Sequence, residues 1–295
     1  MSLVADKPAL DLKTVVYSTD FSQCSHNAGI YAARLAAYFS VKLLVAHAFT
    51  LSQAAIEVET VDRRVSQQRA DLSHLLSQEA ARLATSSAEV VPTLVDGDPK
   101  SAITQLADSN APSMIVLGTH GRSGLERGII GSIAETILRS TRWPTLTVGP
   151  QVQPVTAATL PCKRILFATD FSSAAASAAT YATTLAAVFG ASIDVLNVIA
   201  EDTIGHPEML ADLRNRFYGL LAGLLPQQAS AFCDPRTFVA MGNAHHRILE
   251  HIEDREIDLL VLGLRKTSLI SMEMRASAAF QIIVDAPCPV LTIRR

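Results

Sequence analysis

Four small residues in the first half of the chain have the types and spacing of a phosphate-binding loop. Gly118, Gly121, Gly131 and Ser132 form the pattern G-x2-G-x9-G-S, which follows a short apolar run and leads into a helix-like segment. Glycines let the backbone approach a ligand closely and turn successive N–H groups toward an anion. The first N–H groups of a helix, at its positive dipole end, also favour phosphate. The pattern predicts a nucleotide phosphate site, and the simpler alternative is that the glycines relieve crowding in a strand-to-helix loop.

A carboxylate stands at a second strand end in the same half. Asp20 follows the apolar, β-branched run 14–19, just as Gly118 follows another apolar run. In open α/β sheets, ligands bind at the carboxyl ends of strands, near the point where the strand order reverses. If the two strands are neighbours, Asp20 and the glycines flank one crevice. The alternative is that Asp20 and Ser132 cap helices, and Ser132 and Glu135 have the spacing of a capping box. A capping role and a ligand-binding role are compatible for both residues.

Strand and helix patterns alternate around these residues. Strands are expected where apolar and β-branched residues run together, over residues 14–19, 41–49, 90–95, 113–117 and 145–148. Between them lie segments with helical spacing or helix-start signals, at about 28–39, 61–83, 98–108 and 132–139. Strands separated by helices imply a parallel sheet with helices on both faces. The sequence therefore predicts a doubly wound α/β fold.

The second half of the chain repeats the first. The segment 14–22 returns as 164–172, and the segments 113–118 and 144–148 return as 258–263 and 289–293. A repeat of this size is a domain duplication rather than a solenoid unit. An uncharged, proline-punctuated stretch lies between the copies and reads as a linker. We therefore expect two related domains, over residues 1–152 and 160–295.

The glycine pattern is degenerate in the second copy. Lys266 stands where the first half has Gly121, and Ala276 stands where it has Gly131. The counterparts of Gly118, Ser132 and Asp20 remain as Gly263, Ser277 and Asp170, while Phe280 replaces Glu135. A side chain at either lost glycine obstructs the close backbone approach that a phosphate needs. The second half is therefore expected to have lost the nucleotide, the alternative being that the Lys266 ammonium serves another anion.

Charge and composition exclude several classes of partner. The 295 residues carry a net charge of −3, with 13 Lys and Arg against 14 Asp and Glu in residues 1–155, and 12 against 14 in residues 156–295. Neither half has the basic excess that nucleic-acid or anionic-membrane binding requires. The four cysteines are far apart and no apolar run is long enough to span a membrane. With no leader-like N-terminus, we expect a cytoplasmic protein.

The remaining polar candidates point to no catalytic centre. His245, His246 and His251 lack a complete ligand set and are expected at the surface. His120 is expected to be a loop residue, and His47 a half-buried strand residue that Asn197 replaces in the repeat. No Ser-His-Asp arrangement can be argued from spacing, and no second carboxylate accompanies Asp20 near the loop as a general base would. We expect no enzyme, with at most slow, incidental hydrolysis of a bound nucleotide.

With these residues in view, the whole chain resembles a tandem universal stress protein. The resemblance rests on the sequences Thr19-Asp-Phe-Ser, Val95-Asp-Gly-Asp-Pro and Pro144-Thr-Leu-Thr-Val, and above all on the glycine spacing, which is that family's ATP-binding signature. It implies two Rossmann-like domains of the nucleotide-binding α hydrolase-like type, each with a five-stranded parallel sheet in the order 3-2-1-4-5. It further implies an intramolecular pseudo-dimer that pairs largely through the fifth strands, and homodimerisation of the chain.

The resemblance also assigns the ligand, which would be ATP, ADP or AMP, with Mg²⁺ at the phosphates. By position, Asp20 would approach the ribose or the metal ion, and Ala48 would meet adenine through its backbone. The phosphates would lie in a cradle of N–H groups, with the Ser132 hydroxyl as an added donor. The residues assigned to the nucleotide are Ser18, Asp20, Ala48, Gly118, Gly121, Arg122, Gly131, Ser132 and Ile133.

Three functions follow as hypotheses. The first is a nucleotide-dependent stress-response or regulatory protein, in which adenine nucleotide orders the loop 118–131 and alters partner binding or assembly. The second is an enzyme, either a weak ATPase or a protein that phosphorylates itself on a loop serine such as Ser123. The third is a scaffold that binds no nucleotide. The intact pattern favours the first over the third, and the lack of a visible general base favours it over the second.

Overall fold

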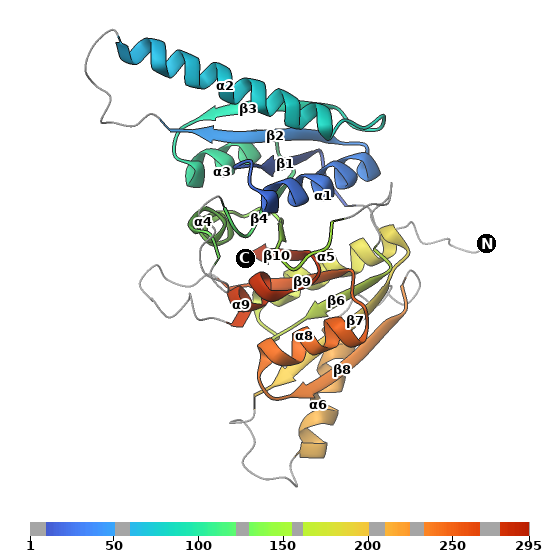
Figure 1. The fold of residues 1–295 in the computed structure, drawn as a ribbon. Coiled ribbons are helices and arrows are strands. Elements are labelled where there is room, and N and C mark those ends of the chain that lie inside the picture. The colour runs from blue at the N-terminus through green and yellow to red at the C-terminus, as the bar shows by residue number, and fades with distance from the viewer. Residues whose placement is uncertain are drawn as a thin grey trace, which may run out of the picture. The chain divides into compact units, whose positions relative to one another are not determined.

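The first half of the chain forms a parallel five-stranded sheet. The computed structural model describes residues 10–50, 60–121, 130–154, 162–200, 210–224, 233–265 and 278–294. In the first half its strands lie in the order β3-β2-β1-β4-β5, with every described pairing parallel. The strands are β1 (Thr14–Ser18), β2 (Lys42–Phe49), β3 (Val90–Asp96), β4 (Ser113–Gly118) and β5 (Thr145–Val148) (Figure 1).

Helices cover both faces of this sheet. Val15, Val16 and Tyr17 follow one another in β1 and are all fully buried, which requires packing on both sides because successive strand residues face opposite ways. Helices α1 and α2 contact each other through His26 and Glu79, and α3 and α4 form a second pair. Their bounds are α1 (Gln23–Phe39), α2 (Thr60–Arg82), α3 (Pro99–Ser109) and α4 (Ser132–Ser140).

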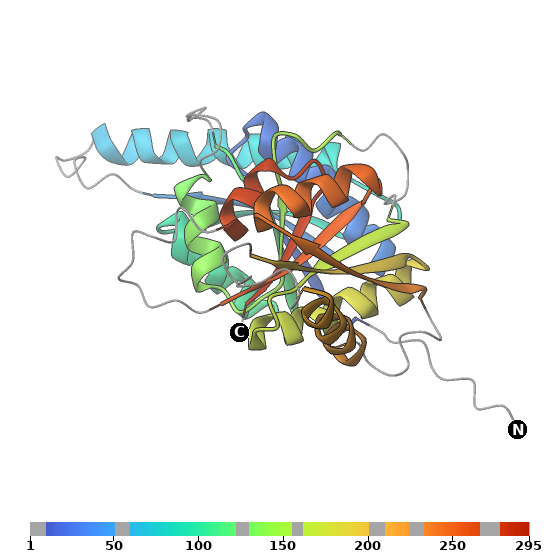
Figure 2. The same ribbon diagram turned by 90° about the horizontal axis from the view of Figure 1, so that it is seen from below.

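The second half has the same topology, in the strand order β8-β7-β6-β9-β10. The strands are β6 (Arg164–Ala168), β7 (Ser192–Ile199), β8 (Pro235–Met241), β9 (Leu259–Leu264) and β10 (Val290–Arg294). The helices are α5 (Ser173–Phe189), α6 (Leu210–Leu224), α8 (Ala244–Asp254) and α9 (Ala278–Asp285). Helices α6 and α8 lie on opposite sides of the strands (Figure 2). The predicted fold and the order 3-2-1-4-5 are thus confirmed in both halves.

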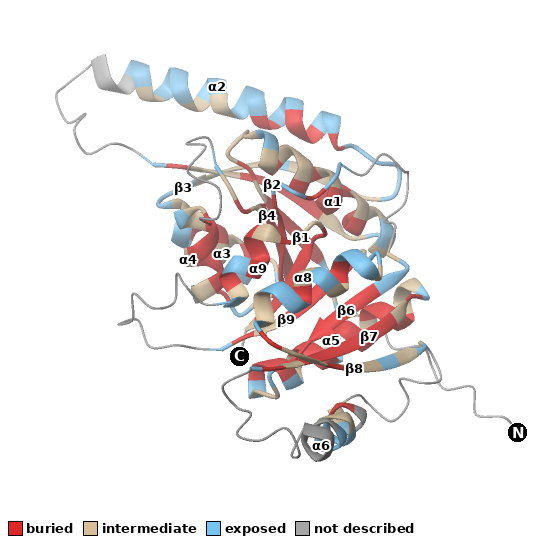
Figure 3. Ribbon diagram, turned by 60° about the horizontal axis from the view of Figure 1, so that its bottom comes forward, coloured by how far each residue is buried: buried red, intermediate tan, exposed pale blue. Residues whose placement is uncertain are grey.

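Each half has its own apolar core. Chain contacts divide the molecule into two compact units, one containing Leu12–Val148 and the other Pro161–Arg295. The central strands are mostly buried, whereas α2 turns an exposed face outward (Figure 3). Among the residues that the structure describes, no helix is both long and apolar enough to cross a membrane.

The two copies begin their first helix in the same way. Ser22 is the N-cap of α1 and its hydroxyl accepts the Ser25 N–H at 3.2 Å, while Ser172 caps α5 and accepts the Ala175 N–H at the same distance. Such a cap satisfies one of the N–H groups that a helix start leaves without an intrahelical partner. Asp20 therefore does not cap α1, because it lies two residues too early.

Candidate nucleotide site

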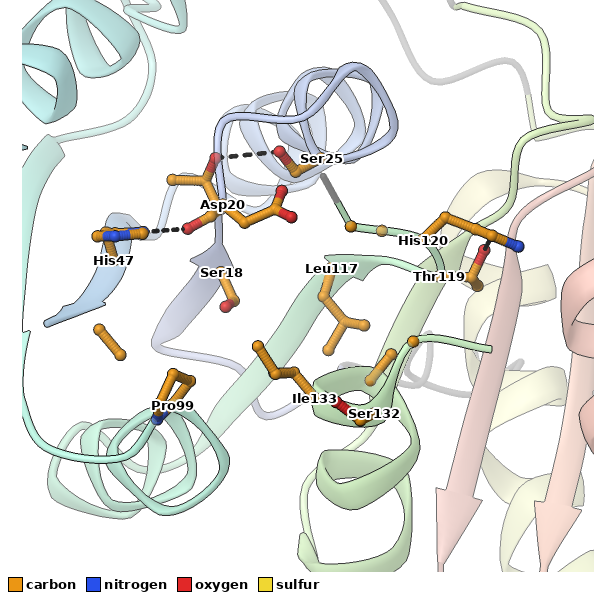
Figure 4. Close-up of a pocket in the computed structure, with 16 residues that line it drawn as sticks. Ser18, Asp20, Ser25, His47, Pro99, Leu117, Thr119, His120, Ser132 and Ile133 are labelled. Carbon is orange, nitrogen blue, oxygen red and sulfur yellow. Dashed lines mark hydrogen bonds between the residues drawn. The ribbon is translucent and has the colours of Figure 1, made fainter. Parts of the chain in front are cut away.

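A cavity of about 420 Å³ opens at the carboxyl ends of the central strands of the first half. Strands β1, β2 and β4 contribute their last residues to it, and the first residues of α3 and α4 close it (Figure 4). Of the nine residues expected at the nucleotide, eight line this cavity: Ser18, Asp20, Ala48, Gly118, Gly121, Gly131, Ser132 and Ile133. Arg122 lies outside the described residues, as does Ser123.

The two oxygens of Asp20 have different neighbours. Oδ1 accepts the backbone N–H of Ser22 at 3.0 Å, which closes a turn around Phe21, a residue with a φ of 62°. A Cβ on Gly121 would lie 2.8 Å from Oδ2, so a larger residue there would displace this carboxylate. One oxygen thus builds the turn before α1, and the other lies beside the glycine loop.

Helix α4 begins at Ser132, where the sequence predicted a helix start. Gly131 is the N-cap with φ −61° and ψ 142°, and Ser132 is the first helical residue, so the capping alternative for Ser132 is wrong. Glu135 makes an ion pair with Arg139 at 2.6 Å. The N–H of Gly131 donates to Thr119 O at 2.7 Å. The next three residues, Ser132, Ile133 and Ala134, line the cavity and carry the first N–H groups of the helix, which have no partner within it.

Gly118 is required by packing as well as by the cavity. A Cβ at this position would lie 2.9 Å from the carbonyl carbon of Cys24 and 3.0 Å from the N of Ser25, both in the first turn of α1. Gly263 has the same relationship in the second half, where a Cβ would lie 2.4 Å from Ala175 N. Relief of crowding, the alternative raised for the glycines, therefore accounts for Gly118 and for its retention as Gly263.

Two histidines, His47 and His120, also line the cavity. The Nδ1–H of His47 donates to Thr19 O at 2.7 Å, and the ring packs on Phe21 with a centroid distance of 4.8 Å. Asn197 reproduces this bond in the second half by donating from Nδ2 to Thr169 O at 2.8 Å. His47 is thus a half-buried strand residue, as expected, and its bond to the β1 end is shared by the repeat.

Several lining residues were not foreseen from sequence. They are Thr19, Ser25, Pro99, Leu117, Thr119 and Ala134, together with His47 and His120, which were expected only as a strand and a loop residue. Most stand next to a foreseen residue, so proximity in sequence to a strand end was the available signal. Ser25 is different, because it reaches the cavity from the first turn of α1, two residues inside the helix.

The charge around the cavity suits a metal ion that arrives with its ligand. Asp20 is the single carboxylate among the described lining residues, and these residues include no Lys or Arg. Within the described part of the chain, no group of three His, Cys, Asp or Glu could hold a metal ion. Magnesium commonly keeps several waters and binds one or two carboxylates plus substrate phosphates. Asp20 with nearby hydroxyl oxygens fits that mode and not a permanent metal site.

The corresponding carboxylate of the second half is already paired. Asp170 keeps the turn by accepting the Ser172 N–H at 2.9 Å, but its Oδ2 also accepts from Nε of Arg265 at 2.8 Å. Arg265 aligns with His120 of the first half. Burial would raise the pKa of Asp170, yet the bonds from Ser172 and Arg265 outweigh it and hold that pKa below the ordinary value. Lys266, Ala276 and Ser277 lie outside the described residues.

The histidines of α8 are less exposed than expected. His251 contacts the buried carboxylate of Asp194 at 3.0 Å, and His245 contacts Asp285 at 2.8 Å, so the surface expectation is wrong for both side chains. Asp194 also pairs with Arg255 at 3.2 Å. Its pKa lies below the ordinary value because hydrogen bonds and charge from His251 and Arg255 outweigh the effect of burial. Only His246 of the three is exposed.

Comparisons with known proteins agree with the duplicated fold. The universal stress protein family model matches residues 11–149 and again residues 161–294. A universal stress protein of Methanocaldococcus jannaschii is 28% identical over 142 residues, covering 46% of this chain and 81% of that protein. Universal stress protein E of Salmonella typhi is 33% identical over 110 residues, covering 37% of this chain but only 35% of its own length.

A solved structure shows the same fold along the whole chain. The crystal structure of a universal stress protein from Archaeoglobus fulgidus has a TM-score of 0.69 at 21% identity, and the match covers 96% of both chains. The two family segments and this full-length likeness agree with the duplicated topology described above. The chain belongs to the universal stress protein family, with one domain of that family in each half.

Proposed function

We propose that the first half binds one adenine nucleotide and that occupancy of this site regulates what the protein binds in a stress response. One observation carries the proposal: the cavity brings Asp20, Gly121 and the start of α4 together at the switch point of the sheet. Ligands of doubly wound folds lie at this place, and phosphates favour helix starts. The volume of about 420 Å³ also falls in the range of ordinary small-molecule sites.

Each wall of the cavity has a chemical part in this proposal. The N–H groups of Ser132 and Ile133 would donate to phosphate oxygens, and the Ser132 hydroxyl would add a further donor. Ala48, at the end of β2, would meet the base, while Ser18 and Gly118 would line the sugar side. The Asp20 carboxylate would hold Mg²⁺, which would neutralise phosphate charge that otherwise repels the carboxylate. Gly121 keeps the space beside Asp20 clear.

The proposed activity is binding and not catalysis. A hydrolase needs a base within hydrogen-bond reach of the attacking water, and Asp20 already uses one oxygen to hold the Ser22 N–H. In the second half the equivalent carboxylate is paired with Arg265, and the glycines that would admit a phosphate are replaced in the sequence. We therefore expect one nucleotide per chain and turnover no faster than in a Gly121→Ala variant.

Quantification of nucleotide carried through purification tests the proposal. Protein is heated to release small molecules, which are separated by chromatography, identified by mass and measured against protein concentration. About one adenine nucleotide per chain supports the proposal. The absence of nucleotide, together with no binding of added ATP, ADP or AMP, favours the scaffold. Incorporation of ³²P from γ-labelled ATP, above that of Gly121→Ala, favours the self-phosphorylating enzyme.

A further inference from the structure

A buried carboxylate lies behind the candidate site, on helix α2. The side chain of Glu79 is only 4% exposed, although it belongs to a helix whose other face is in water. Arg82 donates to it from Nη2 at 2.7 Å and from Nε at 2.9 Å, and His26 contacts it through Nδ1 at 3.2 Å. A buried charge persists only when it is paired and hydrogen-bonded, so these contacts are necessary to it.

Tyr17 connects this carboxylate to the first turn of α1. Its phenol is fully buried, and the hydroxyl lies 2.6 Å from the carbonyl oxygen of Ser25 and 3.2 Å from Oε1 of Glu79. Gly29 makes room for the ring, because a Cβ there would lie 2.8 Å from Tyr17 Cε1. Burial raises the pKa of Tyr17 above its ordinary value, so its hydroxyl stays protonated and acts as a donor.

Ser25 continues the connection into the cavity. Its hydroxyl donates to Ser22 O at 2.9 Å and, having no second hydrogen, accepts from the Thr19 hydroxyl at 3.1 Å. Thr19 Oγ1 in turn accepts the Phe21 N–H at 3.0 Å, within the turn that carries Asp20. Thr19 and Ser25 both line the cavity, and Ser25 is labelled among the lining residues in Figure 4. The single hydrogen of the Tyr17 hydroxyl is shared between Oε1 of Glu79 and the nearer Ser25 O. Contacts therefore lead from Glu79 through Tyr17 and the first turn of α1 to the Asp20 turn.

The second half builds the same fold without the contacts that connect Glu79, Tyr17, Ser25 and Thr19, which together form a polar network. Phe167, Ala175, Ala176 and Ala179 stand at the positions of Tyr17, Ser25, His26 and Gly29. The Asp170 turn is nevertheless present, with the bonds from Ser172 N–H to Asp170 and from Phe171 N–H to Thr169. The network thus accompanies the intact glycine pattern, and the fold does not require it.

We propose that Glu79 and Tyr17 are positioning residues of the nucleotide site, which hold the first turn of α1 and the Asp20 turn in the geometry that receives the ligand. This inference rests on the proposed function, because it concerns the affinity of that same site. It extends the site beyond the cavity lining to a cluster on the far side of α1. The second half, which has Phe167 at the position of Tyr17, supplies one substitution for the test.

The test compares the whole protein with Tyr17→Phe, with Glu79→Gln and with Glu89→Gln as a control. Glu89 pairs with Lys42 at 3.3 Å on the surface, so its variant removes a carboxylate charge away from the cavity. Each variant is titrated with ATP–Mg²⁺ by calorimetry, and backbone hydrogen exchange is measured over residues 19–26 without ligand. Loss of a buried hydrogen bond predicts roughly three- to tenfold weaker binding in the two network variants, with unchanged stoichiometry and faster exchange.

The outcomes separate the two proposals. Nucleotide binding by the whole protein, with weaker binding and faster exchange in Tyr17→Phe but not in Glu89→Gln, supports the positioning role. Wild-type affinity in Tyr17→Phe and Glu79→Gln overturns that role while leaving the nucleotide site in place. No binding by the unaltered protein overturns the proposed function and the positioning role with it. If Glu79→Gln does not fold, Tyr17→Phe still decides, because phenylalanine occupies this position in the folded second half.

Discussion

A Cβ on Gly121 would lie 2.8 Å from Oδ2 of Asp20, and this relationship joins the two sequence features that pointed to a nucleotide. The carboxylate cannot rotate away without cost, because its other oxygen accepts the Ser22 N–H at 3.0 Å. The glycine therefore places no side chain against Oδ2 of the carboxylate. In the second half, Lys266 takes the glycine position and Arg265 donates to the equivalent carboxylate.

Gly121→Ala should weaken nucleotide binding without weakening the fold. The added methyl group meets the Asp20 carboxylate and occupies space at the cavity, so we expect at least about tenfold lower affinity, or about 1.4 kcal/mol. Gly121 is exposed, and surface substitutions usually change stability by less than about 0.5 kcal/mol. Calorimetric titration and thermal unfolding measure the two effects. Gly219→Ala on α6, where a Cβ meets nothing within 4 Å, is the control that should bind normally.

Gly118→Ala should do the opposite and weaken the fold. The new Cβ would lie 2.9 Å from backbone of Cys24, which can move only with α1, so overpacking should lower stability by about 1–3 kcal/mol. Gly263→Ala should be at least as severe, because its Cβ would lie 2.4 Å from Ala175 N. Differential scanning calorimetry would show the loss as a lower Tm. An unchanged Tm in both variants would contradict a packing role for these glycines.

Asp20→Asn and Asp170→Asn should differ in their effect on ligand binding. Asparagine keeps the oxygen that accepts the following N–H group, so both turns should persist. Only at Asp20 is the lost charge expected to matter, with at least about tenfold weaker binding of ATP–Mg²⁺ and a smaller loss for ATP with EDTA. Titrations with and without the metal check this. Equal losses in the two variants would count against the assignment of the site to the first half.

Acid should remove part of the stability that Glu79 contributes. Burial raises the pKa of Glu79, but the bonds from Arg82 and His26 outweigh burial and place that pKa below its ordinary value. The unfolded chain therefore takes up this proton at a higher pH than the folded chain, and stability falls as pH drops from about 5 through the folded pKa. Glu79→Gln should cost about 1–3 kcal/mol at pH 7.

Urea denaturation of the unmodified protein and of Glu79→Gln at pH 7, 5 and 4 measures this difference in stability. The difference in free energy of unfolding between the unmodified protein and Glu79→Gln should become smaller as the pH falls, because acid protonates the Glu79 carboxylate of the unmodified protein. A difference in free energy of unfolding that stays constant over this pH range would mean that the Glu79 charge does not stabilise its contacts with Arg82 and His26. Glu89→Gln, which removes a surface carboxylate, is the control variant for this series.

Most of the architecture could be read from the sequence because it depends on local patterns. The runs over 14–19 and 113–117 are apolar and β-branched, and they form β1 and β4 within a residue or two. The helix expected at about 98–108 is α3, which begins at Pro99, since proline at the first helical position needs no N–H partner. The topology then brought Asp20 and Gly121 together, as the neighbouring strand ends required.

The parts that were missed depend on three-dimensional neighbours. Glu79 lies in a polar segment, yet it shares a helix face with Leu76 and Leu83 and is buried with them. His251 is similarly drawn inward beside Ile252, to the buried Asp194. Ser132 and Gly131 differ by one position at a helix start, and composition alone does not decide which residue is the cap. Side-chain partners across elements are not encoded in local spacing.

The central claim is that one half of this chain binds an adenine nucleotide and the other does not. Calorimetric titration of ATP–Mg²⁺ into the intact chain, after removal of any nucleotide carried through purification, tests it most directly. We predict a single site per chain, abolished or strongly weakened by Gly121→Ala. Two equivalent sites per chain, or a single site unaffected by Gly121→Ala, would contradict the account.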